Sequence, residues 1–343
     1  MGRTEHPVYL TDEKVAVLGA AGAIGSNLVQ TLLASGTANR IAMYDPFEKG
    51  LEGAAEEIYH CAFPKADVTW TAEAGEALTD AAYIITSGGA PRKEGMTRED
   101  LTRDNARIAR QLGRDIKQHC PKCKFLLVIF NPADITGLIA LVHSGLPPGR
   151  VSTLAGLDST RLQSALAQHF NVRQDRVTGC KTYGGHGEQM AVFKSGTQVD
   201  GVPLEEILNG RTANSIGMTP DEWTDIQDRV RGGGARIIGL RGRSSFQSPA
   251  QQSVFMLRGV LGQPYEWPCG AYVNGEGFNH IMMAMPTTLS SEGVSWSMPG
   301  GTPEDLQALR DSYNHLVALR DQIVADGILP PLSRWKESNP NLD

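Results

Sequence analysis

The 343-residue chain lacks long apolar runs and concentrated basic segments. No stretch approaches the roughly 18 apolar residues that a membrane-spanning helix needs, and residues 1–10 lack the apolar core of a signal peptide. The net charge of −6, without a long positive tract, argues against nucleic-acid binding, which requires a concentrated basic surface. We therefore expect a soluble, cytoplasmic protein with neither a membrane nor a nucleic acid as partner.

Cysteine is also scarce. The five residues, an odd number, favour reduced thiols over a disulfide framework. Cys120 and Cys123 stand at C-x-x-C spacing between an expected helix and an expected strand, and no second pair follows at zinc-site distance. We interpret this pair as part of a turn, with a redox or metal role as the alternative, and predict no metal site.

The chain has no internal repeat, low-complexity segment or long linker, so its parts should pack closely. In the first half, apolar strand-like runs alternate with helical stretches, which is typical of an α/β fold with a doubly wound parallel sheet. The expected strands lie at 15–18, 41–44, 68–70, 83–86 and 125–130, and the expected helices at 51–60, 99–119 and 133–143.

After residues 151–154 the pattern changes to longer helices and antiparallel-looking strands. The expected helices are 159–170, 220–240 and 303–325, and the expected strands are near 177–183, 191–194, 269–274 and 280–287. We predict a Rossmann-type domain over 12–156 and an α+β substrate-binding, catalytic domain over 157–330. The polar tail from Lys336 is expected to be frayed.

A glycine-spaced turn follows the first expected strand. In Gly19-x-x-Gly22-x-x-Gly25, the first glycine permits a tight turn, the second lets backbone N–H groups approach a pyrophosphate, and the third allows close packing of helix and strand. Asp45 ends the second strand, where a carboxylate can hold ribose hydroxyls and repel a 2′-phosphate. The pattern predicts NAD rather than NADP, although the glycines also fit a structural turn and Asp45 fits a turn residue before Pro46.

Two further segments carry the residue types that oxidation of a hydroxy acid needs. His186, after Gly184 and Gly185, could exchange a proton with the substrate, and the two glycines would leave room for substrate and nicotinamide. Asp158 could fix the imidazole tautomer, and Arg161, three residues on at a helix start, could bind a carboxylate. Taken singly, His186 also fits a loop histidine and Asp158 a helix N-terminal residue.

A basic, glycine-rich loop follows the fourth expected strand. Arg92 and Arg98 could offer two positive groups, which favours a substrate with two carboxylates, and Gly95 could be the hinge of a closing loop. The alternative is that these are solvated charges. Asn131, before Pro132, should lie at the carboxyl edge of the sheet, where open α/β folds bind ligands, or else be a helix N-cap.

Taken together, the motifs from Gly19 to His186 and their order resemble the malate dehydrogenases of the lactate/malate dehydrogenase family, over about residues 12–330. The resemblance implies that Arg98 polarises the substrate carbonyl, that Arg161 and Arg92 bind the near and distal carboxylates, and that His186 and Asp158 form the proton relay. Lactate dehydrogenases have an uncharged glutamine in place of Arg92.

The resemblance also implies that Asn131 contacts the substrate or the nicotinamide. It further implies a substrate contact from Ser244 or Ser245, and we predict Ser245. It implies NAD contacts from the glycine loop, the second strand and the fourth-strand loop, namely Gly19, Gly22, Ala23, Ile24, Gly25, Asp45, Gly88, Gly89, Asn105 and Asn131. Because the family forms dimers and tetramers, we expect a homodimer or homotetramer.

The chain departs from the family pattern at three places. After His186, where the family usually has Ser-Gly, this chain has Gly187-Glu188. Glu188 could point inward and raise the pKa of His186, or it could point to solvent, and we favour the second interpretation. Ala133 is smaller than the usual aliphatic residue, and 289–296 lacks the usual Gly-x-x-Gly turn.

The predicted activity is reversible, NAD-dependent oxidation of (S)-malate to oxaloacetate. Two alternatives remain, a dehydrogenase for lactate or another 2-hydroxy acid and an NADH-sensing module without turnover.

Overall fold

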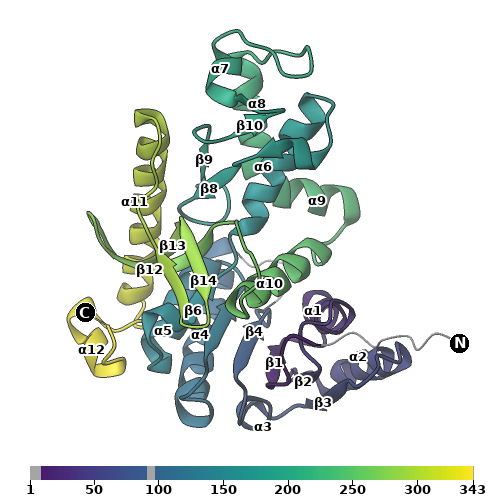
Figure 1. The fold of residues 1–343 in the computed structure, drawn as a ribbon. Coiled ribbons are helices and arrows are strands. Elements are labelled where there is room, and N and C mark those ends of the chain that lie inside the picture. The colour runs from purple at the N-terminus through teal and green to yellow at the C-terminus, as the bar shows by residue number, and fades with distance from the viewer. Residues whose placement is uncertain (1–8, 91–96, 343) are drawn as a thin grey trace, which may run out of the picture.

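The computed structural model describes residues 9–90 and 97–342. Its largest sheet has the strand order β13-β12-β6-β5-β4-β1-β2-β3, with smaller sheets β11-β10-β7, β14-β15 and β8-β9 (Figure 1). The strands are β1 (Val15–Leu18), β2 (Arg40–Tyr44), β3 (Asp67–Thr71), β4 (Tyr83–Thr86), β5 (Phe125–Val128), β6 (Val151–Thr153), β7 (Val177–Thr178), β8 (Lys181–Tyr183), β9 (Ala191–Phe193), β10 (Gln198–Val199), β11 (Val202–Pro203), β12 (Cys269–Gly275), β13 (Phe278–Met285), β14 (Thr287–Ser290) and β15 (Gly293–Trp296).

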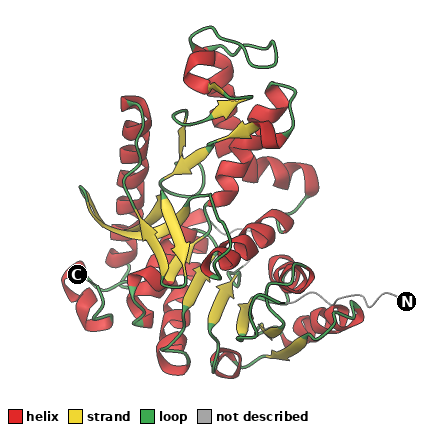
Figure 2. Ribbon diagram, in the orientation of Figure 1, coloured by secondary structure: helices red, strands yellow, loops and turns green. Residues whose placement is uncertain are grey.

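Helices cover both faces of the large sheet (Figure 2). They are α1 (Ala23–Ala34), α2 (Glu48–His60), α3 (Ala74–Leu78), α4 (Arg98–His119), α5 (Ala133–Ser144), α6 (Gly156–His169), α7 (Leu204–Leu208), α8 (Pro220–Arg231), α9 (Gly233–Arg241), α10 (Gln247–Val260), α11 (Pro303–Ala325) and α12 (Trp335–Ser338), with 3-10 turns at Pro148–Arg150, Gln174–Arg176 and Leu332–Arg334.

The doubly wound parallel sheet that the sequence predicts is confirmed. Strands β1 to β6 pair in parallel, and the side chains of β1 alternate between two cores. Val15 and Val17 lie with residues of α1, α2 and α10, whereas Ala16 and Leu18 lie with residues of α4, α5 and α11. The continuously apolar strands therefore reflect burial on both faces.

Strands distant in sequence extend this sheet. β12 pairs antiparallel with β6, and β13 pairs antiparallel with β12. Close approach at this junction requires glycine, because a Cβ on Gly270 would lie 1.7 Å from Thr153 Oγ1. A separate core over residues 162–230 fills the lobe at the top of Figure 1, formed by α6, α7, α8 and strands β7 to β11.

Several expected elements divide or end differently. The single helix expected over 220–240 is wrong, because α8 and α9 are separated at Gly232. The single strand expected over 177–183 is also wrong. Gly179 has φ +69°, and β7 and β8 on either side of it pair in different sheets. The strand expected to reach residue 130 ends at Val128, and neither α10 nor the β14–β15 hairpin was predicted as such.

The C-terminal tail is anchored, so the expectation of fraying from Lys336 is wrong. Asn339 and Leu342 are buried, and Asn339 Nδ2 donates hydrogen bonds of 2.8 Å to the carbonyls of Leu141 and Leu146. Trp335, also buried, begins α12, which packs on α5 at the lower left of Figure 1. The tail thereby gives hydrogen-bond donors to one carbonyl in the last turn of α5 and to one in the segment just after it.

Candidate active site

The glycine loop forms a tight turn at the N-terminus of α1. Gly19 has φ +83°, and a Cβ there would lie 2.6 Å from Gly88 Cα, so the loops after β1 and β4 touch through their glycines. A Cβ on Gly25 would lie 2.1 Å from Gly19 O, which confirms the predicted close packing of helix and strand. Because α1 has no side-chain cap and no acidic residue in its first turn, its N-terminus can accept a phosphate.

Asp45 lies at the end of β2 beside this loop. Its Oδ2 accepts a hydrogen bond of 3.3 Å from Ala21 N–H, and its Oδ1 accepts one of 2.9 Å from Phe47 N–H. The carboxylate thus organises the turn before α2 and is also close to the glycine loop. The two interpretations of Asp45, turn residue and ribose ligand, are compatible in this geometry.

Asn105 of α4 joins the loop after β4 to the end of β5. Its Oδ1 accepts a hydrogen bond of 2.7 Å from Ala90 N–H, and its Nδ2 donates one of 2.6 Å to Asn131 O. Asn105 is buried, whereas the side chain of Asn131 is exposed. A Cβ on Gly89 would lie 3.1 Å from Asn105 Oδ1, so Gly89 allows the loop to approach α4.

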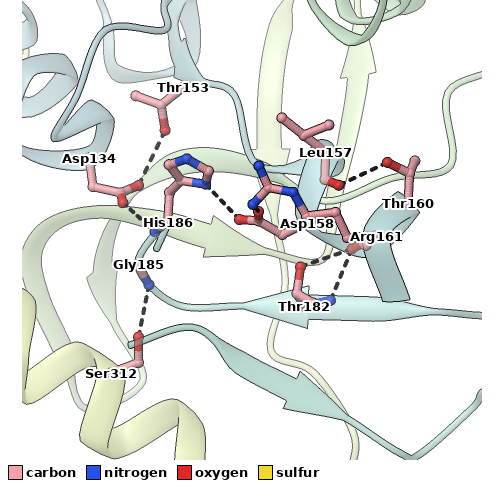
Figure 3. Close-up of polar contacts among 11 residues, drawn as sticks. Asp134, Thr153, Leu157, Asp158, Thr160, Arg161, Thr182, Gly185, His186 and Ser312 are labelled. Carbon is pink, nitrogen blue, oxygen red and sulfur yellow. Dashed lines mark hydrogen bonds and ion pairs between the residues drawn. The ribbon is translucent and has the colours of Figure 1, made fainter. Parts of the chain in front are cut away.

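His186, Asp158 and Arg161 lie together, as Figure 3 shows. His186 Nδ1 is 2.6 Å from Asp158 Oδ2, and Arg161 Nη1 donates a 2.8 Å bond to Asp158 Oδ1. The Asp158 side chain is 3% exposed, while that of His186 is 19% exposed. Since a carboxylate accepts at Nδ1, that nitrogen carries a proton, and Nε2 remains for chemistry.

The surrounding charges raise the pKa of His186 above its usual 6.5. The charge of Asp158 is the largest cause, burial opposes it, and the hydrogen bond to Asp158 and the charge of Asp134 add to it, while Arg161 lowers the pKa. Glu188 is exposed and is not among these causes, in agreement with the interpretation that it points to solvent.

The loop that carries His186 is held by α11 and β13. Gly185 N–H donates a 2.8 Å hydrogen bond to Ser312 Oγ, and Gly184 exchanges backbone hydrogen bonds with Ala284. A Cβ on Gly184 would lie 2.3 Å from Ser312 Oγ, and one on Gly185 3.0 Å from Leu316. The expectation that these glycines leave room for substrate is therefore wrong, because α11 fills that space.

Asp134, in the first turn of α5, is a polar neighbour of His186 to which the sequence interpretation gave no role. It is 3% exposed, and its Oδ2 accepts a 2.7 Å hydrogen bond from His186 N–H. The sequence holds a signal for it, since Asp134 is the one charged residue in the mostly apolar stretch from 125 to 142.

For the other expected site residues, the structure gives fewer contacts. Arg92 and Gly95 lie outside the described residues, and Arg98 begins α4, whose N-terminus has a capping box formed by Thr97 and Asp100. Ser245 Oγ is buried and has no hydrogen-bond partner among the described residues, whereas Ser244 is exposed.

Within residues 9–90 and 97–342, no cluster of three His, Cys, Asp or Glu side chains is placed to hold a metal ion. In the same ranges, no helix is both long and apolar enough to cross a membrane. Cys120 and Cys123 are free thiols at the turn between α4 and β5, where they bond to the carbonyls of Ala81 and Phe125. This position agrees with the interpretation of the pair as part of a turn.

A glycine loop at an uncapped helix N-terminus on a doubly wound sheet, together with a buried His–Asp pair, is typical of dinucleotide-dependent oxidoreductases. Residues 13–153 match the lactate/malate dehydrogenase NAD binding domain, and residues 155–325 match the alpha/beta C-terminal domain of the same family. The chain belongs to the lactate/malate dehydrogenase family, and it is an NAD-dependent oxidoreductase.

Relatives within the family include both dehydrogenases. A malate dehydrogenase of Cereibacter sphaeroides is 33% identical over 305 residues, covering 87% of this chain and 92% of the relative. The crystal structure of malate dehydrogenase from Plasmodium falciparum has a TM-score of 0.84 at 27% identity, and the match covers 92% of this chain and 100% of that one. A lactate dehydrogenase of Cryptosporidium parvum, complexed with lactic acid and nicotinamide adenine dinucleotide, has a TM-score of 0.83 at 26% identity, covering 91% and 98%. The overall fold therefore does not separate the two substrates.

Proposed function

We propose that this enzyme interconverts (S)-malate and oxaloacetate, with residues 12–156 as its NAD-binding domain and 157–330 as its catalytic domain. The observation that carries the proposal is the contact of His186 and Arg161 with the same carboxylate, Asp158, in a chain whose 33% identical relative is a malate dehydrogenase. Bound NAD would supply the hydride acceptor at the substrate carbon.

The proton chemistry falls to His186. Asp158 accepts at Nδ1 and fixes the ring tautomer, so Nε2 takes the hydroxyl proton of malate or returns it to the oxygen of oxaloacetate. Asp158 also stabilises the imidazolium that forms when malate is oxidised. The raised pKa of His186 keeps a protonated fraction available for reduction above pH 6.5.

Arginines would bind the substrate carboxylates. Arg161 gives Nη1 to Asp158, and its Nε is buried with no hydrogen-bond partner among the described residues, so it can donate to a carboxylate beside the reacting carbon. Arg98, the first residue of α4, would polarise the carbonyl, and Arg92, in the segment before α4, would bind the distal carboxylate. Asn131 and Ser245 would complete the substrate contacts.

The cofactor would bind along the carboxyl edge of the sheet. The N-terminus of α1 would hold the pyrophosphate, Asp45 would accept from the ribose hydroxyls, and the loop after β4 would contact the cofactor beyond them. The proposed contact residues are Gly19, Gly22, Ala23, Ile24, Gly25, Asp45, Gly88, Gly89, Asn105 and Asn131.

Initial rates of NADH oxidation with oxaloacetate and with pyruvate, each repeated with NADPH, test the proposal. We expect oxaloacetate with NADH to react fastest. Arg92→Gln should lower kcat/KM for oxaloacetate by about 10²-fold or more, since a buried carboxylate would lose its charged partner, and should favour pyruvate. The same substitution at the surface residue Arg173 should leave the preference unchanged.

Other outcomes would select an alternative. Faster turnover of pyruvate by the unaltered enzyme would indicate a lactate dehydrogenase. NADH binding without turnover of any 2-oxo acid would indicate a sensing module.

We propose a cytoplasmic homodimer or homotetramer, supported by the five free cysteines, which fit a reducing compartment, and by the family's usual assemblies. Light scattering coupled to size-exclusion chromatography would give the mass of the assembly, and a monomeric mass would contradict the proposal.

A further inference from the structure

We propose that Asp134 is a positioning residue of the proton relay, holding the backbone of His186 and supporting the protonated imidazole with its negative charge. The relay would then depend on two carboxylates on opposite sides of His186, Asp158 at the ring and Asp134 at the backbone (Figure 3). The inference rests on the proposed function, in which His186 exchanges a proton with the substrate.

The geometry of Asp134 is set by elements that cannot easily shift. Its Oδ2 accepts the 2.7 Å bond from His186 N–H, and Thr153 Oγ1 lies 3.4 Å from its Oδ1. Thr153, at the end of β6, is enclosed between two glycines, since a Cβ on Gly137 would lie 2.3 Å from its Cγ2 and one on Gly270 would lie 1.7 Å from its Oγ1. Asp134 therefore links His186 to the carboxyl end of β6 in the large sheet.

The bonding pattern favours the ionised form of Asp134 at neutral pH. The pKa of Asp134 is raised to about 6 as the net of opposing causes. Burial is the largest cause and the charge of Asp158 acts in the same direction, whereas the His186 N–H bond, the charge of His186 and, to a smaller degree, Thr153 lower the pKa. The N-terminus of α5, where Asp134 lies, also favours a negative charge. Above about pH 6 the group is mostly a carboxylate.

Asp134 makes its own contribution to the raised pKa of His186, separate from that of Asp158. Asp158 is the first cause of the raised pKa of His186, Asp134 raises it further, and Arg161 opposes both. Asp158 is shared with Arg161 Nη1, which partly neutralises it, whereas Asp134 has no cationic side chain among the groups that act on its pKa other than His186. Loss of the Asp134 charge should therefore lower the pKa of His186.

The test uses Asp134→Asn, which keeps an oxygen acceptor for His186 N–H but removes the charge. In ¹⁵N-histidine-labelled enzyme without substrate, the pKa of His186, assigned with His186→Asn, should fall by about one unit. The acid limb of malate oxidation and the alkaline limb of oxaloacetate reduction should both move to lower pH by the same amount, because oxidation needs neutral His186 and reduction needs it protonated.

Asp305→Asn is the matched control. Asp305 is a buried carboxylate that accepts from the N–H groups of Lys194, Ser195 and Thr302, but it is not among the charges acting on His186. It should lower the melting temperature without moving the pKa of His186. If Asp134→Asn moves that pKa no further than Asp305→Asn does, Asp134 only holds the fold together and the inference is wrong.

A second variant covers the case in which Asp134→Asn does not fold. Thr153→Val is isosteric and removes the hydroxyl near Asp134 Oδ1, so the pKa of Asp134 should rise and the His186 titration should move down, by less than in Asp134→Asn. An unmoved titration in folded Thr153→Val would then overturn the inference. Because the NMR titration needs no substrate, a shifted His186 in an enzyme that turns over no 2-oxo acid would sink the proposed function while supporting the charge effect of Asp134.

Discussion

At the scale of single residues, the site depends on burial as much as on residue type. The chain has eight histidines, but the pair of contacts at His186, Nδ1 with Asp158 and N–H with Asp134, distinguishes it chemically. His143 provides a contrast. Burial lowers its pKa to about 4, so it stays neutral near pH 7, while the carboxylate beside His186 moves the pKa in the opposite direction.

Asp158→Asn should reduce kcat by about 10²- to 10⁴-fold, since the imidazolium loses its principal counter-charge. The pKa of His186 is raised in the folded enzyme, so reduction is supported up to that pKa and declines above it. Removing the charge should move this alkaline limb to lower pH, measured as kcat/KM for oxaloacetate between about pH 5 and 9. Asp175→Asn, at a surface ion pair with Arg173, serves as the control and should leave both kcat and the position of the alkaline limb unchanged. A full-rate Asp158→Asn enzyme would remove Asp158 from the proton relay.

At the scale of secondary-structure elements, the helix ends decide how the site is supported. α5 begins at the site with Asp134 and ends at Ser144 beneath the C-terminal tail. Asn339 donates to the carbonyl of Leu141 in the last turn of α5 and to that of Leu146 just beyond it, while Lys117 of α4 donates to Ser338 O. The tail thus joins the C-terminal ends of the two helices that contribute Asn105 and Asp134.

Asn339→Ala should lower the free energy of unfolding by about 2–4 kcal/mol, because two buried carbonyls each lose a hydrogen bond and, among the described residues, only Leu141 O keeps another, from Ser144 Oγ. Asn341→Ala is the matched comparison, since Asn341 is exposed and donates to Gly145 O in the same turn, and it should cost about 0.5–1 kcal/mol. Urea unfolding followed by tryptophan fluorescence measures both. Equal costs would mean that the tail is not anchored through Asn339.

At the scale of the whole molecule, the large sheet joins segments that are far apart in the sequence. β6 is covered at its edge by β12, and α10 supplies Val254, Leu257 and Val260 to the core in which α1 is buried. The N-terminal half therefore depends on residues near 250–285 for both a sheet edge and part of its core.

A chain truncated after residue 156 should fail to unfold cooperatively, because it loses these partners and exposes an unpaired strand edge. Calorimetry of the truncated chain and of the full chain tests this, with NADH added to each. A cooperative transition that NADH shifts upward in the truncated chain would show that the first half folds independently.

The sequence by itself determined the alternating β/α pattern, the glycine turn at Gly19 and the common helix face of Asp158 and Arg161, because strand burial, helix spacing and glycine conformation are local properties. Local patterns could not predict that α11 packs against Gly184 and Gly185, that the expected strand is divided at Gly179, or that the tail is anchored. Each of these depends on segments of the chain that meet only after folding. The same holds for Asp134. The sequence shows Asp134 as a charged residue in an apolar stretch. Its contact with His186, 52 residues away, exists only because α5 and the loop after β8 meet after folding.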